Sequence, residues 1–201
     1  MKIKQIINNW LALTIIVLML YSAVSLMSAV KFLGDDPFIQ SMPYQQVSAF
    51  SHVLLNLALM TGVLGCGLMI TSSINDGDGQ SSSLLLWITR GWMLLTCLVF
   101  AAGLFSLLEG RHLLELPPLL DVVQVLLAIG FIAGTFLVAK QRNSQFAVWM
   151  AGASIVTVGT AIGVVNAADV VRSELLRGAA VGLVVNLGYP LALVAICFWL
   201  S

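Results

Sequence analysis

The chain has 201 residues, of which 60% are hydrophobic and only 9% are charged, with nine basic residues balancing nine acidic ones. Roughly a quarter of the residues of a soluble domain are charged, so this composition excludes an ordinary water-facing globule. The mean hydropathy of +1.02 indicates an integral membrane protein. The zero net charge argues against nucleic-acid binding, because phosphate recognition needs a surplus of lysine and arginine.

Six apolar stretches are long enough to cross a bilayer as helices, which takes about 20 residues each. In chain order they are Trp10–Phe32, Val47–Thr71, Leu84–Leu107, Leu119–Ala139, Phe146–Val165 and Ala179–Leu200. The stretches are continuous rather than alternating, which is typical of helices and not of a membrane β-barrel. Short connectors leave no room for a water-soluble domain. We therefore expect an all-α polytopic membrane protein, a single domain of six transmembrane helices in an antiparallel bundle.

Basic residues near the ends of these stretches predict the orientation of the chain. A cytoplasmic N-terminus places the larger share of them inside, namely Lys2, Lys4, Arg90, Lys140 and Arg142. The positive start before the first stretch is similar to that of a signal peptide. However, the stretch itself is long enough to span the membrane, so we expect an uncleaved first helix with its N-terminus in the cytoplasm.

Glycine and tryptophan predict how the helices meet one another and the lipid. Two glycine pairs have the GxxxG spacing that allows close helix approach: Gly130 with Gly134, and Gly159 with Gly163. Tryptophans near the ends of spans are expected at the membrane interfaces: Trp10, Trp149 and Trp199.

The two histidines are candidate ligands on the same side of the membrane. His52 lies about one turn into the second stretch, and His112 lies in the loop after the third. An imidazole facing the bundle interior is a functional candidate, because an ionisable group is costly in lipid. The alternative for His52 is an interfacial side chain bonded to a carbonyl or to water. For His112 the solvated loop is the favoured interpretation.

The loop around His112 also concentrates charged residues, since Glu109, Arg111, Glu115 and Asp121 fall within thirteen positions. Its carboxylates could ligate a hard cation such as calcium, and its arginine could pair with propionates or acidic neighbours. A solvated loop with weak surface ion pairs is the other interpretation.

Deeper polar residues are sparse: Asn56 in the second stretch, Gln124 near the start of the fourth, and Asn166 and Asn186 near the outer ends of the fifth and sixth. No chain of acids and histidines crosses the bilayer, which argues against a proton pump or an ion-coupled carrier. No Ser/His/Asp or Cys/His constellation is present for hydrolysis. We therefore expect no complete catalytic site in this chain alone.

Three segments together resemble a known family. The segment EGRHLLELPPLLDVV (Glu109–Val123) is similar to the GREYLE-type loop of subunit I in cbb-type haem–copper oxidases and bacterial nitric oxide reductases. The segment VSAFSHVLLNLALMTGVLGCGLM (Val47–Met69) resembles their second helix, which has a histidine near its outer end. The segment WMAGASIVTVGTAIGVVNAA (Trp149–Ala168) resembles their fifth helix. The resemblance is collinear and implies a truncated relative of the N-terminal six-helix half of that subunit.

This resemblance implies a role for each matching residue. His52 would be an axial ligand of one low-spin haem b. Arg111 would lie by the haem propionates, and Glu109 and Glu115 belong to the loop that lies by a calcium ion in the family. His112 stands where the family has glutamate and becomes a candidate second axial ligand, with a methionine or another chain as alternatives. No copper is expected, because the sixth stretch lacks the family's first metal histidine.

The resemblance thus implies a membrane subunit that acts in respiratory electron transfer or complex organisation, without its own oxygen- or NO-reducing centre. Its expected surroundings are the lipid bilayer of the bacterial inner membrane, other membrane subunits and a periplasmic c-type cytochrome. A haem-free accessory or assembly scaffold is the alternative, and a small transporter or sensor is a third interpretation.

Overall fold

The computed structural model describes residues 2–33, 43–72, 79–105, 118–139, 144–165 and 170–200. Their regular elements are all helical: α1 (Lys2–Leu33), α2 (Tyr44–Ser72), α3 (Gly79–Leu104), α4 (Pro118–Val138), α5 (Ser144–Val165), α6 (Val170–Leu183), the π-helical turn η2 (Val184–Gly188) and α7 (Tyr189–Leu200). Six spans are long and apolar enough to cross a membrane, the last of them running through α6, η2 and α7. The expected all-α membrane fold is confirmed.

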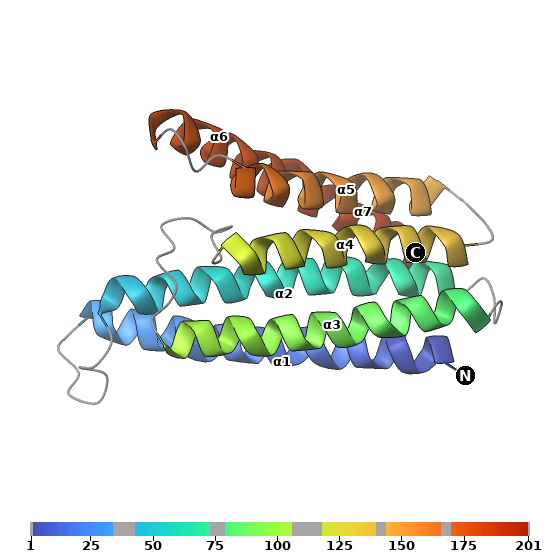
Figure 1. Cartoon of the computed structure of the whole chain (residues 1–201), viewed down its shortest axis with the longest axis horizontal. Coiled ribbons are helices and arrows are strands. Elements are labelled where there is room, and N and C mark those ends of the chain that lie inside the picture. Colours follow the sequence, from blue (N-terminus) through green and yellow to red (C-terminus); the bar gives the residue numbers. More distant parts are fainter. Residues whose placement is uncertain are drawn as a thin grey trace.

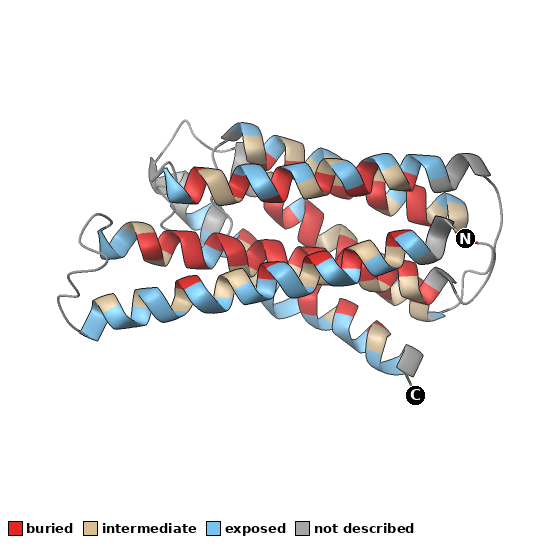
Figure 2. Cartoon of the chain, turned by 90° about the horizontal axis from the view of Figure 1, so that it is seen from below, coloured by how far each residue is buried: buried red, intermediate tan, exposed pale blue. Residues whose placement is uncertain are grey.

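Successive spans run in opposite directions and lie side by side as a bundle (Figure 1). The chain begins at the same end of the bundle at which α2 finishes and α3 starts, and we call this the N-terminal end. Helix α2 is at the centre, because it packs against α1, α3, α4, α5 and α7. It is buried over most of its span, whereas α1 is mostly exposed. Buried residues line the helix faces that meet inside the bundle, and exposed residues cover the outside (Figure 2).

The sixth predicted stretch is only part of a longer helical segment. Helix begins at Val170, nine positions before the predicted start at Ala179, and the segment contains η2 midway. At the end of η2 the Tyr189 N–H donates to the carbonyl of Val184, which lies five residues earlier in the chain. In an α-helix the acceptor would lie four residues earlier. Pro190 explains the wide turn, because its ring would collide with the carbonyl four residues earlier and it has no N–H to donate.

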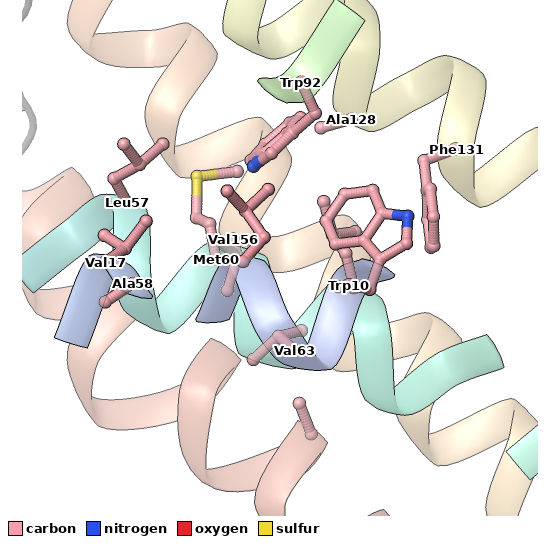
Figure 3. Close-up of a cluster of buried hydrophobic side chains, with 14 of the residues drawn as sticks. Trp10, Val17, Leu57, Ala58, Met60, Val63, Trp92, Ala128, Phe131 and Val156 are labelled. Atoms are coloured by element: carbon pink, nitrogen blue, oxygen red, sulfur yellow. The ribbon is translucent and has the colours of Figure 1, made fainter. Parts of the chain in front are cut away.

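The core is built around aromatic side chains. The Trp10 ring lies 5.5 Å from the Trp92 ring and 4.6 Å from the Phe131 ring, measured between centroids (Figure 3). Trp10 and Trp149, expected near the interfaces, each lie five residues from the start of their spans, but both are fully buried and face the bundle interior instead of lipid. Each indole N–H bonds inside the bundle instead: Trp10 to Thr89 Oγ1 (2.8 Å), Trp92 to Thr61 Oγ1 (2.9 Å) and Trp149 to the Val63 carbonyl (2.7 Å).

Small residues bring neighbouring helices into close contact, as the GxxxG spacing predicted. A Cβ added at Gly134 would lie 3.0 Å from Leu85 of α3, and one at Gly130 would lie 3.3 Å from Ile88. Gly159 faces Val184 in the same way. Gly152 of α5 differs from these positions, because its added Cβ would meet backbone atoms of η2 and α7 rather than side chains.

Candidate functional site

His52 is the one sequence-predicted ligand that the structure describes, and it lies on the outside of the bundle. It is exposed, although it belongs to the most buried helix. The structure therefore places this imidazole away from the core. The other four predicted site residues, Glu109, Arg111, His112 and Glu115, lie outside the described residues.

The exposed imidazole belongs to a regular stripe on α2. Between Val47 and Ile70 every α2 side chain is buried except seven, which alternate four and three positions apart. We call these residues the α2 stripe: Ser48, His52, Leu55, Leu59, Gly62, Cys66 and Met69. This 3.5-residue spacing is the one that a second helix follows when it packs along the first at a shallow angle.

The α2 stripe lies between the sides of α2 that contact α1 and α7, and we call the strip of α2 surface between these two helices the gap. On one side, a Cβ added at Gly62 would lie 3.6 Å from the Thr14 methyl group of α1. On the other side, Asn56, one turn beyond His52, accepts a hydrogen bond of 2.7 Å from the Tyr189 hydroxyl of α7. The helices that flank His52 are thus the first and the last of the described bundle.

The walls of this gap become polar near His52. The Thr14–Gly62 contact fixes the register of the antiparallel pair α1 and α2. It places Ser25 and Ser28, both half-buried on the Thr14 face of α1, near the level of His52 and Ser48. Hydroxyl groups therefore accompany the imidazole at this depth.

Centring the span of α2 on a bilayer gives His52 a depth within the hydrocarbon layer. The span Tyr44–Ile70 has Leu57 at its middle. Five residues separate Leu57 from His52, which is about 7.5 Å along the helix axis. The apolar half-thickness of a bilayer is about 15 Å. An exposed ionisable group at this depth is costly in bare lipid, which makes His52 a candidate functional residue.

Three buried polar contacts behind the α2 stripe join α2 to its neighbours. Besides the Asn56–Tyr189 bond, Gln124 of α4 donates to Met60 Sδ at 2.7 Å, and Thr160 of α5 approaches the same sulfur at 4.0 Å. The sequence indicated Asn56 and Gln124 as polar positions but not their partners. When a helix has no polar face, its sequence does not indicate which of its residues contact a given neighbouring helix.

A haem b fits the described residues only in part. Such a haem needs axial ligands on the iron and an apolar slot for the ring. His52 can supply one imidazole on the outer surface of α2. The interior beside it is filled by side chains such as Leu57, Met60 and Val63 (Figure 3). The described part of the chain thus offers half of a two-ligand site, and this half faces outward.

An apolar groove of about 590 Å³ lies elsewhere, between α4 and α5. Ile129, Ala133 and Phe136 line one wall, and Met150 and Thr157 belong to the other. The Thr157 hydroxyl donates to the Ala153 carbonyl, so it is already satisfied. The groove offers no imidazole, and its surface suits hydrocarbon.

Comparison with known proteins leaves the family open. No family model, no curated protein and no solved structure matches the chain. The comparisons therefore assign no family, and what is established is a six-span helical membrane protein with an exposed histidine within its central helix.

Proposed function

We propose that the chain is a membrane subunit of a respiratory electron-transfer complex and that it pairs with another membrane chain along the α2 stripe. One observation carries the proposal: His52 is exposed on the central helix at a depth where lipid alone is a poor neighbour. A partner helix over the α2 stripe would cover the imidazole. Gly62 and Ser48 are small enough to let such a helix approach closely.

The electron-transfer role follows from the resemblance in the second helix together with this placement. His52 would hold one b-type haem from the outer face of α2, and the partner chain would supply the second axial ligand. The haem supplies one-electron transfer when bound. The protein contributes the imidazole, the serine hydroxyls at its level and the exclusion of water from the gap. A periplasmic c-type cytochrome is the proposed electron partner, and Glu109 and Glu115 remain the proposed calcium ligands.

A haem-free scaffold is the second candidate, favoured by the close packing behind the α2 stripe. Asn56 is already bonded to Tyr189, and Met60 is in contact with Gln124. In this case the α2 stripe binds the same partner helix, and His52 forms a hydrogen bond to it instead of an iron bond.

A visible spectrum separates the two candidates. The protein is purified in mild detergent with its native partners, and the reduced-minus-oxidised spectrum and extracted haem are measured. We expect close to one b-type haem per chain in the wild type and none in His52→Ala. His112→Ala is the matched control and should keep the signal, because the partner supplies the second ligand. A full signal in His52→Ala would refute the ligand assignment, and no haem in the wild-type complex would favour the scaffold.

Partner binding is tested separately by a bulky substitution on the α2 stripe. Leu59→Trp should abolish co-purification of the partner chain, because the indole would fill the gap between α1 and α7. Leu126→Trp is the control on the exposed face of α4, where Leu126 is 62% exposed. Equal co-purification by both variants would refute docking along the α2 stripe.

A further inference from the structure

We infer that Arg90 and Trp87 on α3 form a binding site for the phosphate group of an anionic phospholipid. Both residues are exposed, and the guanidinium carbon of Arg90 lies 5.3 Å from the centre of the Trp87 ring. The opposite side of α3 makes the core contacts through Thr89 and Trp92. The pair thus lies on the side of α3 that does not make these core contacts.

Arg90 lies too deep for an ordinary water-exposed cation. The span of α3 runs from Ser83 to Leu104, so Arg90 is seven residues, or about 10 Å, from the span's start. Helical side chains tilt toward the start of their helix, and the contact with Trp87 shows that the guanidinium turns this way. The charge is therefore directed toward the headgroup layer at the N-terminal end of the bundle.

The described side chains provide no anion for this charge. Asp121 is the one carboxylate among them, and it is buried in the first turn of α4, at the other end of the bundle. Within the described residues Arg90 thus has no carboxylate partner, and a guanidinium partly within an apolar layer favours an anion from its surroundings. The lipid phosphates of the headgroup layer toward which the side chain is directed are the anions that a membrane supplies, and arginine binds phosphate through its forked N–H groups.

The order of side chains along this face matches the order of groups in a phospholipid. Trp87 is nearest the headgroup layer, where exposed tryptophans are enriched, and Arg90 follows. Leu94, at the middle of the span, and Leu98, one turn beyond it, continue the same face and are 62% and 46% exposed. The headgroup would therefore lie against Arg90 and Trp87 while an acyl chain extends toward Leu94. This order favours a lipid over an acidic side chain of a partner protein.

An anionic lipid should be preferred over a zwitterionic one, because phosphatidylcholine carries its own neutralising cation. One basic residue near the membrane surface corresponds to about 1 kcal/mol of attraction to anionic lipid, or about a fivefold preference. Trp87 reports on the site directly, since Trp10, Trp92 and Trp149 are fully buried and shielded from lipid.

The test is quenching of tryptophan fluorescence by brominated lipids in reconstituted vesicles. The protein carries Trp199→Phe, which removes the fifth tryptophan, and brominated phosphatidylglycerol is compared with brominated phosphatidylcholine. We expect half-maximal quenching at an about fivefold lower mole fraction of the anionic lipid. Arg90→Gln should remove this preference, while Arg90→Lys should keep most of it.

Lys31→Gln is the matched control, because Lys31 is the other basic residue whose side chain the structure describes, at the opposite end of the bundle. It should keep the full preference. Unchanged emission from the buried tryptophans verifies that Arg90→Gln is folded. Equal quenching by the two lipids in the unsubstituted site, or an unchanged preference in folded Arg90→Gln, would overturn the inference.

Discussion

The α5–α7 crossing gives the sharpest test of the fold, through the substitution Gly152→Ala. An added Cβ at Gly152 would lie 2.7 Å from the Ala192 nitrogen and 2.8 Å from the Gly188 carbonyl oxygen. Both neighbours are backbone atoms of the partner helix, so no side chain can rotate away. The two helices must therefore move apart, and contacts along the whole crossing loosen.

The expected size of the effect follows from two opposing contributions. Overpacking of a well-packed interior costs about 1–3 kcal/mol. Because the backbone at this crossing is rigid, we expect an overpacking cost of about 3 kcal/mol for Gly152→Ala. Replacing a mid-helix glycine by alanine stabilises the helix by about 1 kcal/mol. The net loss should be about 2 kcal/mol. Gly62→Ala is the matched control, because its Cβ would meet only the Thr14 methyl group at an ordinary 3.6 Å. It should be neutral or slightly stabilising.

The assay is reversible unfolding in mixed micelles, with increasing mole fraction of a denaturing detergent and tryptophan fluorescence as the signal. We expect Gly152→Ala and Gly62→Ala to differ by about 2–3 kcal/mol in free energy of unfolding. Ala192→Gly should not rescue Gly152→Ala, since the collision is with the Ala192 backbone nitrogen. Equal stability of the two alanine variants, or rescue by Ala192→Gly, would refute the proposed backbone contact.

Two further substitutions test buried polar groups in the same assay. Tyr189→Phe removes the donor to Asn56 Oδ1 and should cost about 1 kcal/mol, because the amide oxygen is left buried without it; a variant as stable as the wild type would contradict this bond. Thr135→Val should leave stability unchanged or raise it by up to about 1 kcal/mol, because the Thr135 hydroxyl is fully buried and bonds no group in the described structure. Thr61→Val is its control and should destabilise, since Thr61 accepts the Trp92 indole bond; equal effects of the two threonine variants would argue against the assigned bonding.

Hydropathy predicted the spans well because the bilayer imposes a length that apolar sequence must match. The second predicted stretch, Val47–Thr71, differs from α2 by only a few residues at its start and one at its end. The first helix begins eight residues before its predicted start, and the last helical segment begins at Val170. Both extensions contain polar and charged residues, which a helix accommodates outside the lipid but a hydropathy criterion omits.

The rotation of each helix about its axis was beyond the sequence. Helix α2 is apolar nearly all round, so no periodic pattern identified it as the central helix or indicated which face stays open. For this reason His52 had two interpretations, and the structure places it on the outside. The buried positions of Trp10 and Trp149 were missed for a related reason, since each indole needed a bonding partner on another helix that sequence spacing cannot identify.

The central position of α2 has a consequence for how the protein is made. Helices α1 and α2 are synthesised first and pack against each other extensively, so they can form a hairpin as soon as both are inserted. The α2 surfaces for α5 and α7 must wait for segments made roughly a hundred residues later. Until α7 arrives, Asn56 has no tyrosine to bond and faces lipid. During biogenesis this surface of α2 is thus the one most in need of a membrane chaperone, and a ribosome stalled before Tyr189 would leave it uncovered.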